Sequence, residues 1–361
     1  MRYIIDETVK HPAYMQLYLQ LRSAITESVY AYGEKLPSKR LMAAETDTSV
    51  ITVEHAYQLL CDEGYTEARQ RSGYFVIYQK GDFYPVAEYE NTHSVPAVHH
   101  HTEETFPFSV LAKTMRYVLS EYGEQILVKS PNLGSHELRQ AIASYLARSK
   151  GMKVLPRQIV IGSGAEYLYS LIVQLLGRHR IYALENPSYE KIRSVYTANG
   201  VRCDMLKMGK DGIQSSALHS TNATVLHVTP FHSFPSGITA SASKRMEYIQ
   251  WAKERSGIII EDDFDSEFTV STKNEDTVFS LEPEKTVIYI NTFSKTIAPS
   301  MRIGYMVLPR EMVELFLERI GFYSCTVPVF EQYVLAEFIN KGDFERHINR
   351  IRRKRRQQQK K

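Results

Sequence analysis

The chain has 361 residues, of which 43% are hydrophobic and 24% are charged. This composition is typical of a globular protein with a sizeable core and, at about 100–200 residues per domain, of two or three domains. The net charge of +3 is unevenly spread, because residues 341–361 hold ten Lys and Arg against two Asp and Glu. The remainder carries a net charge of −5, which excludes a uniformly basic nucleic-acid coat.

Three cysteines, Cys61, Cys203 and Cys325, lie far apart and form no Cys-x-x-Cys pair. We therefore expect a reducing, cytoplasmic compartment, without a disulfide framework or a zinc site. The first ten residues contain no apolar run, and no stretch of about 18 apolar residues occurs in the chain. Neither a signal peptide nor a membrane span is expected.

Residues 1–78 predict a small domain of three helices followed by two short strands. Apolar residues at helical spacing between 14 and 25 predict the first helix. Ser38 and Ser49 are placed to cap the next two helices, over 39–46 and from 50 to Gly64. Strands are expected over 65–68 and 73–78. This order of elements is that of a winged helix-turn-helix domain.

The third helix of such a domain enters the major groove of DNA with its amino-terminal end. We expect Ser49, Ile51, Thr52 and His55 to face the DNA there. Lys39 and Arg40, at the start of the second helix, are expected to contact the DNA backbone. Arg69 and Arg71, between the strands, are expected to contact phosphates or the minor groove.

Residues 79–104 are polar, contain two prolines and show no sustained periodicity, which indicates a linker. They include the tract His99-His-His101. We interpret this tract as part of the linker rather than as a metal site, because no further ligand is evident. No bound metal is expected.

From residue 105 to residue 361, β-rich segments alternate with helical patterns, which predicts an α/β domain with a mainly parallel sheet. A helix is expected over 166–176, with others between further strands. The expected strands are 158–161, 180–184, 201–206, 224–228, 257–261 and 286–291. Ligands of such sheets bind beyond the carboxyl ends of the strands, and the polar motifs of this domain fall at those ends.

The strongest chemical signal is Lys295, which comes shortly after the last predicted strand. A lysine in a partly apolar site can form a Schiff base with an aldehyde. Arg302 offers a planar fork suited to a phosphate, and Thr292 and Ser294 add hydroxyl donors. Asp262, at the end of another strand, is placed to hold a pyridine nitrogen protonated.

An anion site is expected at Gly164 and Ala165, where a helix opens directly after a strand and leaves backbone amides free. None of these elements is specific alone. Their order along the chain is a phosphate seat, an aromatic residue, a carboxylate, a lysine and an arginine, each after a strand. This order indicates pyridoxal 5′-phosphate as the cofactor.

The amino-terminal part resembles the GntR-type winged helix over nearly all of residues 11–76. The matching segments are Leu36-Pro-Ser-Lys-Arg-Leu41, Thr52-Val-Glu-His-Ala-Tyr57, Glu63-Gly-Tyr65 and Ser72-Gly-Tyr-Phe-Val76. Two positions that are usually basic in that family are Val50 and Glu54 here, and residues 1–78 carry a net charge of −2. Because non-specific affinity depends mainly on phosphate neutralisation, we expect a monomer to bind DNA weakly. The alternative is a winged helix that serves dimer contacts alone.

The remainder, from about 105 to 356, resembles fold-type I aminotransferases, and the fusion of both parts resembles the MocR/GabR-type regulators. The matching segments are Glu185-Asn-Pro-Ser-Tyr189, Thr229-Pro-Phe-His-Ser-Phe-Pro-Ser-Gly237, Glu261-Asp-Asp-Phe-Asp-Ser-Glu-Phe268 and Thr292-Phe-Ser-Lys-Thr-Ile-Ala-Pro-Ser-Met-Arg302. The resemblance implies that Lys295 is the Schiff-base lysine, Asp262 the partner of the pyridinium nitrogen and Tyr189 the residue stacked on the ring. The groups it implies for the phosphate are Arg302, Thr292, Ser294 and the amides of Gly164 and Ala165.

Three departures from that family concern the cofactor. Phe264 replaces a tyrosine, Lys191 replaces an arginine, and the segment 129–133 lacks a tyrosine that commonly reaches a partner's phosphate. Related chains continue past the basic helix 345–356 into a small carboxy-terminal domain. We expect its absence to leave the cofactor cleft open and to impair complete transamination.

These observations leave three hypotheses open. The first is a regulator that binds operator DNA as a homodimer and senses a small amino compound through pyridoxal phosphate. The second is a pyridoxal-phosphate-dependent aminotransferase with an accessory DNA-binding domain. The third is a truncated, nonfunctional relative. The fusion of both modules favours the first.

Overall fold

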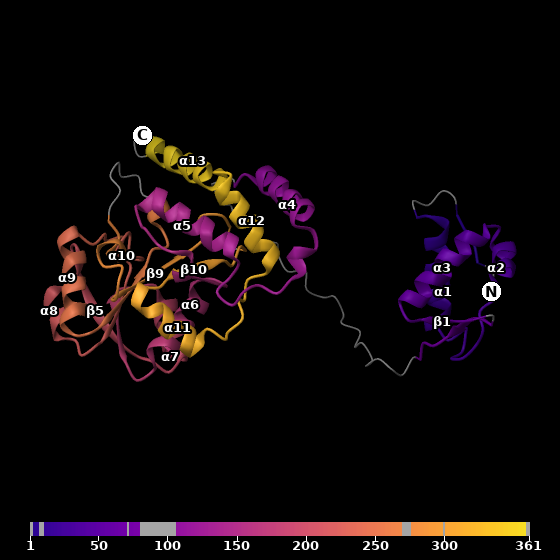
Figure 1. The fold of residues 1–361 in the computed structure, drawn as a ribbon, viewed down its shortest axis with the longest axis horizontal. Coiled ribbons are helices and arrows are strands. Elements are labelled where there is room, and N and C mark those ends of the chain that lie inside the picture. The colour runs from indigo at the N-terminus through magenta and orange to yellow at the C-terminus, as the bar shows by residue number, and fades with distance from the viewer. Residues whose placement is uncertain are drawn as a thin grey trace. The chain divides into compact units, whose positions relative to one another are not determined.

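The computed structural model describes residues 3–6, 11–70, 72–79, 106–268, 276–298 and 300–358. The chain divides into two compact units, an N-terminal unit (Met1–His99) and a C-terminal unit (His100–Lys361) (Figure 1). Nearly all of the predicted linker, with the tract His99-His-His101, lies outside the described residues, as does Arg71. No helix in the described part is both long and apolar enough to cross a membrane.

The described part of the N-terminal unit has the predicted order of elements. Its helices are α1 (Ala13–Thr26), α2 (Lys39–Thr46) and α3 (Val50–Asp62), and its strands are β1 (Thr66–Arg69) and β2 (Gly73–Val76), which pair antiparallel. The Ser38 and Ser49 hydroxyls accept hydrogen bonds from the backbone amides of Leu41 and Thr52, which caps α2 and α3 as predicted. This part of the chain is a winged helix-turn-helix.

The core of the N-terminal unit holds α3 against α1 and the wing. Leu21, Val53 and Leu60 have no exposed surface. Tyr57 is equally buried, and its hydroxyl donates to the Pro37 carbonyl at 2.9 Å. The buried side of α3 is thereby fixed, and the opposite side of its first turns is left exposed.

The C-terminal unit is built on one sheet. Its described strands are β3 (Ile159–Gly162), β4 (Ile181–Asn186), β5 (Arg202–Gly209), β6 (Gly212–Ile213), β7 (Val225–Val228), β8 (Ile258–Asp262), β9 (Val287–Thr292) and β10 (Gly304–Val307). They lie in the order β3-β10-β9-β8-β7-β4-β5-β6. The pairs from β9 across to β5 are parallel, whereas β10 runs antiparallel to both of its neighbours. The mainly parallel sheet is confirmed; β6 and β10 were not among the predicted strands.

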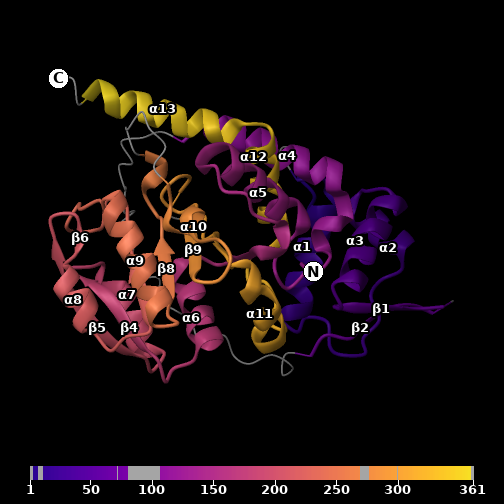
Figure 2. The same ribbon diagram turned by 60° about the vertical axis from the view of Figure 1, so that its left-hand side comes forward.

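Helices cover both faces of this sheet (Figures 1 and 2). The described helices are α4 (Phe108–Tyr122), α5 (His136–Lys150), α6 (Ala165–Leu176), α7 (Glu190–Ala198), α8 (Ser215–Ser220), α9 (Ala242–Glu254), α10 (Val278–Leu281), α11 (Val313–Ile320), α12 (Val329–Asn340) and α13 (Asp343–Gln358). Successive residues of β9 alternate between two buried clusters, one formed with α5, α9, α12 and α13 and the other with α6, α7 and α11. With both faces apolar, polar chemistry is left to the strand ends.

Candidate cofactor site and DNA-binding surface

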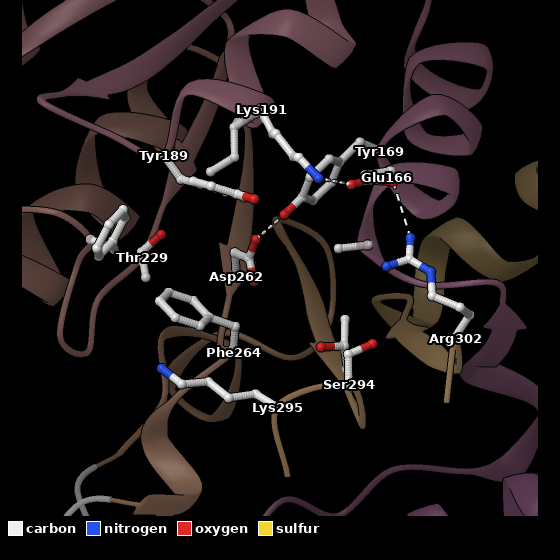
Figure 3. Close-up of a pocket in the computed structure, with 14 residues that line it drawn as sticks. Glu166, Tyr169, Tyr189, Lys191, Thr229, Asp262, Phe264, Ser294, Lys295 and Arg302 are labelled. Carbon is white, nitrogen blue, oxygen red and sulfur yellow. Dashed lines mark hydrogen bonds and ion pairs between the residues drawn. The ribbon is translucent and has the colours of Figure 1, made fainter. Parts of the chain in front are cut away.

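A cavity of about 370 Å³ lies at the carboxyl ends of β8 and β9, beside the start of α6 (Figure 3). Seven of the eight predicted cofactor residues line it, namely Ala165, Tyr189, Asp262, Thr292, Ser294, Lys295 and Arg302. The eighth, Gly164, lies against Arg302, because a Cβ atom at this glycine would stand 3.2 Å from Nη2 of the arginine. The structure therefore brings the predicted groups to one place.

Asp262 ends β8 as a buried carboxylate, 3% exposed, within this cavity lining. Its Oδ2 atom accepts a hydrogen bond from the Tyr169 hydroxyl and lies 3.6 Å from Nε2 of His227. Burial and the neighbouring Asp262 raise the pKa of Tyr169 well above its ordinary value, which keeps the hydroxyl protonated as a donor. Within the described residues, Oδ1 has no hydrogen-bond partner. A ligand that presents an N–H group to this oxygen would satisfy it.

The support of Asp262 extends one residue further. The ring of His227, buried on β7, has its Nδ1 atom 2.8 Å from the Tyr196 hydroxyl of α7. The sequence analysis did not single out Tyr169, His227 or Tyr196. Tyrosines at apolar positions of helices, and a histidine within an apolar strand, look like ordinary core residues. Their polar groups need hydrogen-bond partners when buried, and this requirement was the only sequence signal that pointed to them.

The amine of Lys295 forms an ion pair with a carboxylate that follows β8. Nζ lies 2.7 Å from Oδ1 of Asp265 and 4.7 Å from the ring centroid of Phe264, which Figure 3 shows beside the amine. The side chain is 43% exposed. The lysine thus lines the cavity with its charge held by Asp265, a residue that sequence analysis did not assign to the site.

The helix start predicted to bind an anion is the amino-terminal end of α6. Its backbone amides lack intrahelical partners, and Arg302 stands against Gly164 at this end of the helix. The carboxylate of Glu166 joins two cations there, with Oε2 3.0 Å from Nη2 of Arg302 and Oε1 3.2 Å from Nζ of Lys191. The hydrogen bond from Lys191 lowers the pKa of Glu166, so this side chain is charged near neutral pH. Glu166 was not predicted as a site residue.

The two hydroxyls expected at the phosphate, those of Thr292 and Ser294, have different surroundings. Thr292, the last residue of β9, is buried and lines the cavity. Ser294 donates from its hydroxyl to the Met301 carbonyl at 3.2 Å, so it serves the connection between β9 and β10 in this arrangement.

Two loops frame the aromatic side of the cavity. Tyr189 follows β4 and meets Phe234 edge to face, with ring centroids 6.1 Å apart. The Glu185 carboxylate accepts hydrogen bonds from the Thr229 amide at 3.1 Å and the Ser233 hydroxyl at 2.5 Å. Burial raises the pKa of Glu185 to about 7. Glu185 therefore ties the end of β4 to the loop that carries Phe234.

The predicted DNA-facing residues of α3 lie at one end of that helix. Ser49 caps it, and its hydroxyl stands 2.9 Å from that of Thr52. Ile51 is 74% exposed, and the exposed His55 packs edge to face on Tyr14. This end of α3 is open to a partner.

The basic residues of the N-terminal unit are partly neutralised from within. Nζ of Lys39 lies 2.5 Å from Oε1 of Glu54, which projects from α3. Arg69 pairs with Glu67 at 2.6 Å and stacks on the ring of Phe75. Arg40, next to Lys39, is exposed, whereas Arg71 lies outside the described residues.

Comparison with known families accounts for both units. Residues 13–76 match the family described as bacterial regulatory proteins, gntR family, and residues 100–361 match aminotransferase class I and II. A GntR-type winged helix followed by an aminotransferase domain defines a class of transcriptional regulators. The chain belongs to this class, and within it to the helix-turn-helix regulators that include MocR.

Individual relatives span nearly the whole chain. The chain is 33% identical to the uncharacterized HTH-type transcriptional regulator YdeL of Bacillus subtilis, over 97% of this chain and 78% of that protein. It is 27% identical to the probable rhizopine catabolism regulatory protein MocR of Rhizobium meliloti, over 97% of this chain and 76% of the relative. The family resemblance stated from the sequence is thereby confirmed.

A solved enzyme shares the fold of the C-terminal unit. The kynurenine aminotransferase of Pyrococcus horikoshii, in complex with PMP, superimposes with a TM-score of 0.62 at 25% identity. The match covers 69% of this chain and 64% of that enzyme, so the chain spans less than two thirds of its length. The fold-type I architecture predicted from the sequence is confirmed.

Proposed function

We propose that this transcription regulator binds pyridoxal 5′-phosphate in the cavity at β8 and β9 and uses it to sense a small amino compound. We assign residues 1–78 to operator binding and residues 105–361 to the cofactor. The observation that carries the proposal is Asp262, a buried carboxylate whose Oδ1 atom lacks a partner among the described residues. Ala165 at the start of α6, Arg302 and Lys295 line the same cavity.

The lining residues fit the three functional groups of this cofactor. Asp262 would hold the ring nitrogen protonated, with Tyr169 keeping the carboxylate in place. The α6 amides and Arg302 would take the phosphate, with Thr292 and Ser294 as hydroxyl donors, and Tyr189 would cover the ring. Lys295 would hold the cofactor covalently through Nζ.

We base the sensing role on two partners of the Lys295 amine, which are the aldehyde carbon of the cofactor and the carboxylate of Asp265. When bound, the cofactor supplies an aldehyde carbon for which the effector's primary amine competes with Lys295. Asp265, 2.7 Å from Nζ, is placed to hold the charge of the lysine whenever its amine is free. The effector would bias the regulator between two states that differ in DNA affinity.

The experiment that tests the cofactor assignment is reductive trapping. Purified protein is mixed with pyridoxal 5′-phosphate, reduced with borohydride and digested, and the peptides are weighed. We expect one adduct, at Lys295, and a visible absorbance that is lost in Lys295→Ala while the circular dichroism spectrum is retained. An unmodified Lys295 peptide after reduction would overturn the assignment.

The DNA-binding assignment has its own test. Footprinting is carried out on the DNA directly upstream of the gene that encodes this chain, with and without the cofactor and candidate amines. A protected site that changes with an amine is expected. Arg40→Ala should weaken binding to all sequences alike, since Arg40 is assigned to a phosphate. A loss confined to particular sequences would contradict that role.

We also propose that the regulator acts as a homodimer in the cytoplasm. Large apolar side chains support a second copy as the partner. Phe322 is 70% exposed and Leu127 82% exposed. Asn132 donates to the carbonyl of Gly321, which joins the two segments that carry them. Surfaces of this kind mark interaction sites. Light scattering should give the mass of a dimer, and Phe322→Asp that of a monomer.

An aminotransferase with an accessory DNA-binding domain is the second candidate, favoured by the fold and by Lys295. Phe264, however, offers no hydroxyl to the cofactor. Steady turnover of an amino donor and an oxo-acid acceptor, abolished in Lys295→Ala, would support this candidate over a sensing role.

A further inference from the structure

Among the described residues, each of the three cations that line the cavity is paired with a carboxylate of the chain itself. Lys295 is held by Asp265, whereas Lys191 and Arg302 share Glu166. In Figure 3 the Glu166 side chain extends between Lys191 and Arg302, with a dashed contact to each. The carboxylate therefore occupies the position at which an incoming anion would meet the two cations.

The place of Glu166 on its helix explains why it reaches this position. It is the second residue of α6, in the first turn, where a negative side chain is favoured by the helix dipole. Arg302 lies close to the same helix start, since a Cβ atom at Gly164 would stand 3.2 Å from its Nη2 atom. The same helix start that would receive a phosphate thus presents a carboxylate of its own to the same cations.

We propose that Glu166 is an internal competitor for the phosphate of a phosphate monoester bound at the start of α6. It neutralises Arg302 and Lys191 in the empty seat, and it repels a bound dianion. The seat therefore has lower affinity than its cations alone would give, and occupancy follows the free concentration of the ligand. This inference rests on the proposed function, in which the monoester is pyridoxal 5′-phosphate.

The alternative is that Glu166 orients Arg302 for the phosphate, as a purely structural neighbour would. The two roles predict opposite signs. Removing a competitor strengthens phosphate binding, whereas removing an orienting partner weakens it. Glu166→Gln separates them, because the amide keeps a hydrogen-bond acceptor for Arg302 and loses only the charge.

The test compares two ligands that differ by the phosphate. Pyridoxal 5′-phosphate and pyridoxal are titrated by absorbance into full-length wild type, Glu166→Gln and Glu190→Gln. Glu190 is an exposed acid at the start of α7 that does not line the cavity, so it controls for net charge. We expect Glu166→Gln to lower the dissociation constant of the phosphate ester roughly five- to thirtyfold. Pyridoxal should change by less than about twofold.

Inorganic phosphate alone gives a measurement that does not need Lys295. Its stabilisation of the C-terminal unit against heat is measured in the same three proteins, and greater stabilisation of Glu166→Gln is expected. Equal or weaker stabilisation in that variant overturns the inference, even where the Lys295 adduct forms. Stronger phosphate binding by Glu166→Gln without any adduct supports the inference and overturns the cofactor assignment.

Discussion

Glu185 shows how a single buried acid holds two loops of the cofactor site. Its carboxylate oxygens accept hydrogen bonds from the Thr229 amide and from the Ser233 hydroxyl. Because burial raises its pKa from 4.5 to about 7, the folded chain binds this proton more tightly than the unfolded chain does. Ionising Glu185 is therefore a cost to the folded state.

The sign of the resulting pH dependence follows from linkage. Between about pH 5 and 7 the native state holds the extra proton, so this residue makes stability fall as the pH rises and level off above that range. Glu185→Gln removes the effect. Urea unfolding of the C-terminal unit at pH 5, 6, 7 and 8 should give a shallower decline in the variant than in wild type. Parallel curves would contradict the shifted pKa.

Glu54 limits the charge that the N-terminal unit offers to DNA, since it pairs with Lys39 at 2.5 Å. We expect Glu54→Gln to tighten non-specific DNA binding about two- to fivefold at low salt and to steepen the salt dependence by about one counterion. Glu45→Gln, on the exposed side of α2, adds the same charge without freeing Lys39. Equal effects of both variants in fluorescence anisotropy titrations would rule out the specific role of the ion pair.

For individual residues, the sequence revealed those whose side-chain type itself suggests a reaction or a charge contact. It did not reveal residues whose role depends on a contact with a distant residue. Lys295, Asp262 and Arg302 stand out because each is a reactive or charged type beside a strand end. Tyr169 and Glu166 acquire their roles from Asp262 and Arg302, which lie 93 and 136 residues away. Local patterns contain no information about pairings over such distances.

Among the elements, α12 shows how a helix can fix a loop through one polar side chain. Gln332 has no exposed surface, its Oε1 accepts from the Ser135 amide at 2.6 Å, and its Nε2 donates to the Val327 carbonyl at 2.8 Å. Ser135 in turn caps α5, since its hydroxyl accepts from the Leu138 amide.

Gln332→Leu should therefore destabilise the C-terminal unit by about 2–4 kcal/mol, because the buried Ser135 amide loses its acceptor and the Val327 carbonyl loses the Nε2 donor. Gln250→Leu, the same change at an exposed glutamine of α9, is the control and should stay within about 0.5 kcal/mol. Chemical denaturation measures both. A similar small loss in each would show that water replaces the buried contacts.

Element boundaries were predictable where capping residues mark them. Ser38 and Ser49 gave α2 and α3 their correct first residues, and the strands from β3 to β9, except β6, fall within a few residues of the predicted ranges. β10 was missed because four buried residues after a loop carry no periodicity. Its antiparallel direction is set by pairing with β3 and β9 rather than by its own sequence.

For the whole molecule, the buried clusters do not mix residues of the two units: one cluster lies between residues 3 and 76, and two lie between residues 138 and 351. We expect two transitions in scanning calorimetry. Leu60→Ala should lower the transition temperature of the N-terminal unit, and Phe344→Ala that of the C-terminal unit. Each substitution should reduce the free energy of unfolding of its unit by about 3–5 kcal/mol. Pyridoxal 5′-phosphate should raise only the transition that Phe344→Ala lowers. A single cooperative transition shifted by both variants would contradict this independence.

The connection between β9 and β10 carries Lys295 and Arg302 seven residues apart. A small molecule bound by both the Lys295 amine and the Arg302 guanidinium would link the two ends of this connection. If Lys295 no longer bound the molecule, only the contact with Arg302 would hold the connection. The first consequence of effector binding would be faster amide hydrogen exchange in residues 293–298 and 300–303, a loosening of main chain before any domain moves.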